Sequence, residues 1–479
     1  MGPGRGHALI RRALVFAAAL VVVAPVHAAR AHPPARAQPN AIVRENRLPG
    51  TDAWLAPLAS QDAIDGYASR ISVRPGAVVP LHVSTAAPYS IRVYRLGWYR
   101  GLGARLLACI PRRCTVTEQG HTFPVPQPDP STGYLDAGWP VTDTVRVGRS
   151  WTSGYYLAEP QLADGTVARI PFVVLAPSRS KPTAMLVQAS VNTWEAYNRW
   201  GGQSLYTNQT GVGDNRVSFS RPFYAKDQGP LDWEISVVRF LERNGFDVSY
   251  TTDVDTDARP TELLRHKLDV VAGHDEYWTK RMRDAYDTAL AQGVNLAFMG
   301  ANVGYWQIRY ENARRTIVEY RIAATDPEPD PALKTTTFDN LGRPGCKLGG
   351  VEYTGGVDES AGHVMRDYTV VDSSLADPWF AGTGFTPGAV LPGLVGYEWD
   401  QIVPGCEPPS LTDFFHYAGS PTDGEKPADA VRWIAPSGAT VFSAGSLQFA
   451  WGLDAFREQR ADPRLQRFVL NAFRAMLHR

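Results

Sequence analysis

The stretch VVAGHDEYW, residues 270–278, changes abruptly from apolar to ionisable side chains. His274 and Glu276 are two residues apart, so an extended backbone directs both side chains to one side. An imidazole and a carboxylate on one side of a cleft suit general acid–base catalysis or metal binding. Asp275 and Tyr277 alternate with His274 and Glu276, so an extended backbone directs them to the other side. We expect Asp275 to face solvent or cap a helix, and Tyr277 to pack in the interior.

Each candidate residue also has an ordinary structural explanation. His274 alone is typical of an exposed loop histidine, and Glu276 alone of a cap for the following helix. Tyr197 alone is typical of a hydrogen-bonded core tyrosine, and Asn302 of a turn. The chemical interpretation therefore depends on whether these side chains meet.

Three apolar segments end in polar or aromatic clusters, which favours such a meeting. AMLVQAS is followed by residues 191–198, LDVVAGH by residues 275–277, and VNLAFMG by residues 301–306. In an open parallel sheet, ligands bind beyond the carboxyl ends of the strands. If these segments are parallel strands, the three clusters converge at one edge.

The order of elements supports a multidomain fold, β followed by α/β. Residues 41–178 contain short alternating runs separated by turn residues, which predicts a β-sandwich. Residues 182–479 alternate between strands and amphipathic helices, which predicts a parallel α/β domain. We expect it to be Rossmann-like, of the glutamine-amidotransferase-like kind, with an irregular Gly/Pro-rich insertion at residues 325–430.

The N-terminus has the pattern of an export signal. A basic stretch, an apolar run and small residues before Ala28 predict a signal peptide at residues 1–28, and an uncleaved anchor is the alternative. Residues 29–40 are expected to be a disordered leader. The sequence thus predicts a secreted or cell-envelope protein without a stable membrane span after cleavage. In that setting, Cys109 with Cys114 and Cys346 with Cys406 are plausible disulfides.

Charge and motifs exclude several function classes. The formal net charge is zero, so electrostatics gives no argument for nucleic acid as a partner. The chain has no dinucleotide-binding G-x-G-x-x-G after a strand, no P-loop, no H-E-x-x-H and no G-x-S-x-G elbow. Covalent catalysis by Ser or Cys therefore has no support in the sequence.

Six stretches, taken together and in order, resemble the large (beta) subunit family of N,N-dimethylformamidase. They run from about Tyr94 to the C-terminus and are YRLGWYRGLGARLL, WTSGYYLAE, NTWEAYNRWGG, GHDEYW, GANVGYW and GSLQFAWGLD. The resemblance implies an amidohydrolase with one iron ion. The family enzyme is intracellular and works with a small partner subunit, whereas this chain has the pattern of an export signal. This chain also has His-Asp-Glu where the family has His-Pro-Glu.

The resemblance also implies a set of site residues. The iron ligands would be Tyr156, Tyr197 and Glu276, with His274 and Asn302 close by as catalytic residues. Two phenolates and a carboxylate are hard anionic donors that neutralise Fe³⁺. Three protein ligands leave positions for water and a substrate carbonyl.

The leading hypothesis is an exported, iron-dependent hydrolase of an amide or related C–N bond in a small molecule. A small partner subunit and a homo-oligomer both remain open. The alternative is a non-enzymatic carbohydrate- or surface-binding protein, motivated by its tryptophans Trp98, Trp194, Trp200 and Trp306. A third hypothesis is a metal-free hydrolase that uses Glu276 or Glu398 as its base.

Overall fold

The computed structural model describes residues 38–479, except 61, 115–118, 207–214, 225–229, 357–364, 457–459 and 479, together with residues 1, 2 and 4. The expected signal peptide and most of the leader lie outside these described residues. Residues Asn40–Arg479 form one compact unit of mixed α/β structure, rich in strands. In the described part of the chain, no helix is both long and apolar enough to cross a membrane.

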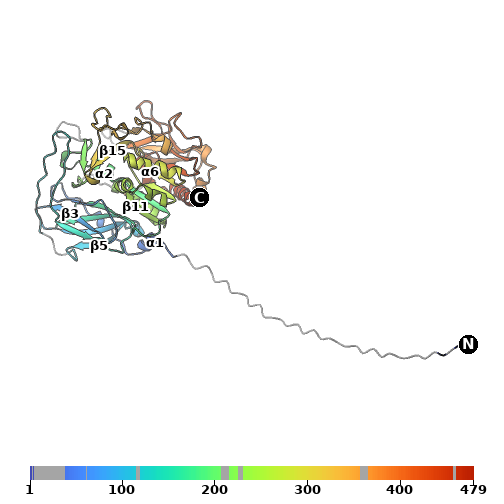
Figure 1. Ribbon diagram of the computed structural model, residues 1–479, viewed down its shortest axis with the longest axis horizontal. Coiled ribbons are helices and arrows are strands. Elements are labelled where there is room, and N and C mark those ends of the chain that lie inside the picture. The colour runs from blue at the N-terminus through green and yellow to red at the C-terminus, as the bar shows by residue number, and fades with distance from the viewer. Residues whose placement is uncertain are drawn as a thin grey trace. The chain divides into compact units, whose positions relative to one another are not determined.

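Two sheets occupy the N-terminal part of this unit, where β3 and β5 are labelled in Figure 1. The first has the order β1 (Asp65–Ala68), β3 (Val78–Ser84), β6 (Asp143–Arg146). The second has the order β2 (Ser72–Val73), β8 (Ile170–Val174), β7 (Gly154–Gln161), β4 (Ser90–Leu96), β5 (Ala104–Ile110). Alternate residues of both sheets, such as Val79, Val93 and Phe172, pack into one shared core.

A nine-stranded sheet dominates the rest of the chain. Five neighbouring strands are parallel, in the order β11 (Val248–Thr252), β9 (Met185–Ala189), β12 (Leu268–Val271), β14 (Asn295–Phe298), β23 (Thr440–Ser443). Four antiparallel strands extend it, in the order β22 (Ala428–Ile434), β21 (Thr412–Tyr417), β18 (Arg366–Val370), β19 (Val390–Val395). Three of these four lie wholly within residues 325–430, so the expected insertion completes the sheet.

Helices cover both faces of the parallel strands. Val187 and Val270 share a core with α4 (Ile235–Arg243) and α8 (Pro463–His478), whereas Leu186 and Val271 share another with α6 (Lys280–Ala291). Successive strand residues thus point to opposite faces, which explains why these strands are apolar throughout. Helix α6 begins where the Thr279 side chain accepts a hydrogen bond from the Met282 amide, as the sequence predicts.

The parallel strands reverse their spatial order at β9. Along the chain β11 follows β9 on one side, and β12 then lies on the other side. The connections that leave β9 and β12 therefore diverge and open a crevice at the carboxyl ends of these two strands. This is the position at which the sequence places its polar clusters.

A four-stranded sheet beside this edge was not expected from the sequence. Its order is β10 (Arg216–Ser218), β16 (Thr316–Val318), β15 (Trp306–Glu311), β13 (Tyr277–Thr279). A two-stranded pair, β17 (Glu352–Gly356) with β20 (Glu398–Gln401), lies within the insertion. Both expected disulfides, Cys109–Cys114 and Cys346–Cys406, are present.

The remaining helices are short. The α-helices are α1 (Ala41–Glu45), α2 (Val191–Tyr197), α3 (Pro230–Trp233), α5 (Asp253–Ala258) and α7 (Cys346–Gly349). The sequence predicts one helix over residues 231–245, and the structure breaks it at Glu234, between α3 and α4. Residues 260–265 form a 3₁₀-helix where a short helix is expected.

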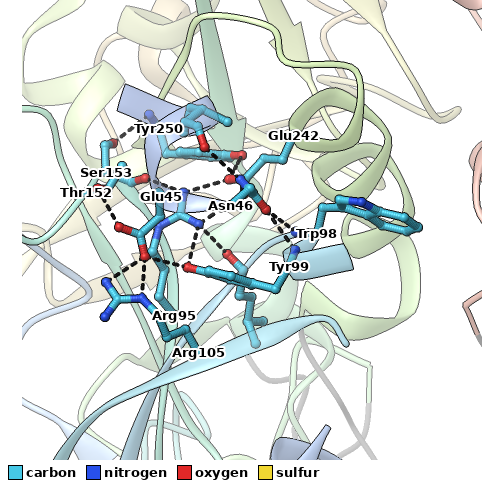
Figure 2. A network of polar contacts seen from close by, with 12 residues as sticks. Glu45, Asn46, Arg95, Trp98, Tyr99, Arg105, Thr152, Ser153, Glu242 and Tyr250 are labelled. Atoms are coloured by element: carbon cyan, nitrogen blue, oxygen red, sulfur yellow. Dashed lines mark hydrogen bonds and ion pairs between the residues drawn. The ribbon is translucent and has the colours of Figure 1, made fainter. Parts of the chain in front are cut away.

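A buried ion pair joins the N-terminal sheets to the α/β part. Arg95 of β4 donates two hydrogen bonds to the Glu242 carboxylate of α4, at 2.6 and 3.0 Å, and neither side chain is exposed to solvent. Figure 2 shows that Glu242 also accepts from Tyr250 and Asn46. The carboxylate thus accepts hydrogen bonds from three segments of the chain and fixes how they pack against α4.

Replacing Glu242 with Gln should destabilise the protein by about 3–5 kcal/mol, because it leaves the Arg95 charge buried without a counter-charge. Urea denaturation followed by circular dichroism measures the change. Arg265→Met is the matched control, because its pair with Glu262 is partly exposed and should cost less than about 1 kcal/mol. Equal losses in the two variants would contradict the role given to the buried pair.

Candidate active site

Tyr197 and Glu276 meet at the crevice between β9 and β12. Helix α2 starts directly after β9 and ends at Tyr197, so the helix carries this phenol to the carboxyl edge of the sheet. The Tyr197 hydroxyl donates to Glu276 Oε2 at 2.8 Å. The two connections are also joined by the Glu276 amide, which donates to the Thr193 hydroxyl at 2.9 Å.

His274 lies against both groups. Its Nε2 is 3.4 Å from the Tyr197 hydroxyl and 3.4 Å from Glu276 Oε2. Gly273 precedes it, and a Cβ there would come within 3.0 Å of Trp233 and Glu234. A glycine is therefore required for the backbone to leave β12 so close to helix α3.

Asn302 and Glu398 complete the group on the other side of His274. Glu398 Oε2 is 3.4 Å from His274 Nε2 and accepts a hydrogen bond from Asn302 Nδ2 at 3.0 Å. Asn302 has a φ of 52°, a left-handed conformation that asparagine tolerates better than most residues. Its amide donates to Asp400 Oδ1 at 2.8 Å, which holds the turn after β14 in place.

The charges around His274 favour its protonated form. Burial lowers the pKa of this imidazole, but the carboxylates of Glu398 and Glu276 offset that effect and raise the pKa to about 9. Burial, together with Glu276 and Glu398, raises the pKa of Tyr197 well above its usual value. At neutral pH and without a metal ion, His274 is therefore a proton donor and Tyr197 a neutral phenol.

Sequence reasoning missed the second phenol at this site. The Tyr206 hydroxyl lies 3.1 and 3.3 Å from the two Glu276 oxygens, and its ring stacks on Tyr197 with centroids 4.6 Å apart. The Tyr277 hydroxyl donates to the Tyr206 hydroxyl, so Tyr277 is not only a packing residue. Arg321 lies over the Tyr206 ring, 4.2 Å from its centroid. Tyr206 follows no strand or periodic segment, so nothing in the sequence marks it.

The structure does not bring Tyr156 to this cluster, which corrects the expected ligand set. Its hydroxyl donates to the Thr152 carbonyl at 2.6 Å, and its ring stacks on Trp151 and Phe172 in the core of the N-terminal sheets. Tyr155, the next residue along β7, points to the opposite face, where its hydroxyl bonds to Glu234. Among the described residues, no hydrogen bond or ring contact joins Tyr156 to Tyr197, His274 or Glu276.

Asp275 is also not where the sequence places it. It is fully buried and accepts a hydrogen bond from Gln188 Nε2 at 2.7 Å, so it neither faces solvent nor caps a helix. Asp253 is buried beside it, and burial together with the Asp275 carboxylate raises the pKa of Asp253 well above its usual value. The residue between His274 and Glu276 therefore anchors this segment to the sheet.

The oxygen atoms of Tyr197, Tyr206 and Glu276 suit a hard metal ion, one that prefers anionic oxygen ligands. Atoms bound at about 2.0 Å to one ion, at angles near 90–110°, lie about 2.8–3.3 Å apart. The Tyr197 oxygen lies 2.8 Å from Glu276 Oε2, and the Tyr206 oxygen lies 3.1 and 3.3 Å from the two Glu276 oxygens. Phenol and carboxylate oxygens are ligands suited to Fe³⁺.

A second group of potential ligands lies on β21 and β22. Ligand atoms of Asp413, His416 and Asp429 lie within 4.8 Å of one another. His416 is half exposed, and its Nδ1 forms a 2.6 Å pair with Asp429. This pair accounts for the cluster without a metal ion.

A family model described as N,N-dimethylformamidase beta subunit-like, C-terminal, matches residues 90–463, which include the whole cluster. The chain belongs to this family. The N,N-dimethylformamidase beta subunit of Paracoccus aminophilus is 30% identical over 297 residues, which cover 53% of this chain and 38% of that protein. The beta subunit from Alcaligenes sp is 29% identical over 106 residues, 21% of this chain and 14% of that protein.

The chain thus spans less than two-fifths of the length of these two dimethylformamidase beta subunits. Among solved structures, a cycloisomaltooligosaccharide glucanotransferase from Paenibacillus sp. aligns with a TM-score of 0.17 and 9% identity, over 53% of this chain and 57% of that one. A likeness that weak carries no argument about fold or function.

In the metal-free protein, Glu398→Gln should lower the pKa of His274 from about 9, because it removes the carboxylate that contributes most to keeping the imidazole charged. A titration of the histidine ring signals by NMR measures this, with His274→Gln used to assign the signal. Glu425→Gln is the control, since Glu425 pairs with Arg366 instead. An unchanged His274 pKa in Glu398→Gln would contradict the geometry.

Proposed function

We propose that the protein is an exported hydrolase of amide or related C–N bonds, and that it holds one iron ion. The observation that carries the proposal is the meeting of Tyr197, Glu276 and His274 at the carboxyl ends of β9 and β12. Family membership supports the hydrolase class, because the curated relatives are named as subunits of an amidohydrolase.

The ligands in this proposal are Tyr197, Tyr206 and Glu276. Tyr206 replaces Tyr156 because its hydroxyl already contacts Glu276. An iron ion at this position would polarise the substrate carbonyl and lower the pKa of a bound water. Glu276 is 2% exposed, which limits the access of bulk water to its oxygens.

Residues of the chain itself hold and transfer the protons that the reaction needs. Protonated His274 donates to the departing nitrogen, which must leave as an amine. Glu398 lies 3.4 Å from His274 Nε2 and stabilises the imidazolium before the transfer. Asn302 Nδ2 holds Glu398 in this position through its 3.0 Å hydrogen bond.

Export, fold class and assembly are part of the same proposal. The two disulfides support an oxidising compartment, in agreement with the signal-like residues 1–28. The shared core of the N-terminal sheets supports a β-sandwich, and the parallel strand order supports a Rossmann-like second domain. A partner subunit is also proposed, because the curated relatives are named beta subunits.

The carbohydrate-binding alternative gains no support from the structure. Of the four tryptophans that motivate it, Trp194 and Trp200 are buried. Arg239 and Arg243 lie over the Trp98 ring, and Arg321 lies over the Trp306 ring. These side chains do not form an open aromatic platform for a sugar. We therefore propose the enzyme alone.

Iron loading should distinguish Tyr206 from Tyr156. The wild-type protein should bind one iron ion and gain visible absorption from phenolate-to-iron charge transfer, measured by elemental analysis and spectrophotometry. Tyr197→Phe, Tyr206→Phe and Glu276→Gln should each weaken iron binding by tenfold or more, whereas Tyr156→Phe should leave it unchanged. Loss of the absorption in Tyr156→Phe, with retention in Tyr206→Phe, would reject this ligand set.

Iron-loaded protein should release amines from simple amides, measured by an amine-specific assay. His274→Gln should lower kcat by about 10²–10⁴-fold, because it removes the proton donor for the departing nitrogen. His416→Gln is the control, since His416 lies on β21 and pairs with Asp429. Wild-type activity in His274→Gln would remove His274 from the reaction, and no amine release from any amide would overturn the proposed function.

A further inference from the structure

A cavity adjoins the site beyond Asn302. It has a volume of about 460 Å³ including the open solvent at its mouth. Asn302 lines it and also bonds to Glu398, so one residue separates the cavity from His274. Tyr305 lines it too, and its amide donates to the Glu276 carbonyl at 2.9 Å. The cavity therefore lies where the remainder of a substrate would extend from the reacting group.

The walls of this cavity combine carboxylates with aromatic rings. Asp339, Glu352 and Asp400 are its ionisable residues, and no lysine or arginine stands among the described residues that line it. The rings of Tyr305 and Tyr353 meet edge to face with centroids 5.3 Å apart, and Phe338 adds a third ring. The faces of aromatic rings attract cations electrostatically, and they do not attract anions.

The three carboxylates have few compensating charges. Asp400 accepts the Asn302 amide, and Glu352 accepts the Cys346 amide at 2.8 Å. Arg283 is the cation that acts on Glu352, and it is already paired with Asp287 at 3.2 Å. Burial, together with Glu352 and Glu398, raises the pKa of Asp400 to about 7, against the lowering effects of the Asn302 amide and of His274. A positive charge in the cavity would relieve this mutual repulsion.

A second observation indicates that a ligand belongs here. Asn302 is only 2% exposed, and its Oδ1 has no hydrogen-bond partner among the described residues. A buried carbonyl oxygen without a donor is costly, and an N–H group of a bound molecule would satisfy it. A positively charged ligand with N–H groups would satisfy both the Asn302 Oδ1 acceptor and the carboxylates.

We propose that this cavity holds a positively charged ammonium group of the substrate, so that the enzyme prefers C–N substrates that carry a protonated amine. The proposal rests on the proposed hydrolase function and adds the class of substrate. An organic ammonium is favoured over an inorganic cation because the Tyr305 and Tyr353 rings in the cavity wall offer apolar surface to its alkyl groups, whereas a metal ion needs a full shell of oxygen ligands.

Two amides of equal size test the preference. N-(4-aminobutyl)acetamide carries an ammonium at neutral pH, and N-pentylacetamide carries a methyl group in its place. The iron-loaded wild type should show kcat/KM roughly tenfold higher for the charged amide, mainly through KM. Glu352→Gln and Asp339→Asn should each reduce this preference, while Glu311→Gln, a carboxylate outside the cavity, should retain it. Equal kcat/KM for the two amides would overturn the proposal.

A binding measurement separates this inference from the proposed function. Pentylammonium, titrated into the full-length protein by calorimetry, should bind the wild type and the Glu311→Gln control, and bind Glu352→Gln at least several-fold more weakly. If pentylammonium binds in this way but neither amide is hydrolysed, the hydrolase function fails and the cation site stands. If calcium or magnesium binds at the Glu352-dependent site and pentylammonium does not, the ammonium proposal is overturned.

Discussion

Glu276 is 2% exposed, and among the described residues no lysine or arginine forms an ion pair with it. A carboxylate in that position must be satisfied by donors, by a proton or by a cation. Tyr197, Tyr206 and the His274 ring supply the donors, and His274 supplies the positive charge. Glu398 and Glu276 together raise the pKa of the imidazole, and burial with these two carboxylates keeps the Tyr197 phenol neutral.

The frame around the site limits how far these groups can move. Helix α4 carries Glu242, which ties the N-terminal sheets to the α/β part through Arg95. Just before α4, Trp233 and Glu234 press against Gly273, the residue that precedes His274. The packing that joins the two parts of the chain therefore also sets where the backbone leaves β12.

The sequence predicts the parallel strands and long helices well because their burial is periodic, and it places His274, Glu276 and Asn302 because each follows a strand. The choice of Tyr156 comes from the family resemblance, and the sequence could not show which way this side chain points, since adjacent strand residues face opposite sides and only tertiary packing decides which side is the core. Asp275 was misplaced for a related reason. Its burial depends on Gln188 of the neighbouring strand, a pairing that spacing along the chain does not reveal.

Much of the cavity wall comes from a part of the chain that does not carry His274. His274 and Asn302 follow strands of the nine-stranded sheet, whereas Glu352 and Tyr353 belong to β17, in the region that the Cys346–Cys406 disulfide tethers. The partner strand of β17 carries Glu398 and Asp400, which hold His274 and Asn302. The segment that shapes the cavity thus also anchors the acid–base groups, so a new specificity has to be grafted with Glu398 and Asp400 retained.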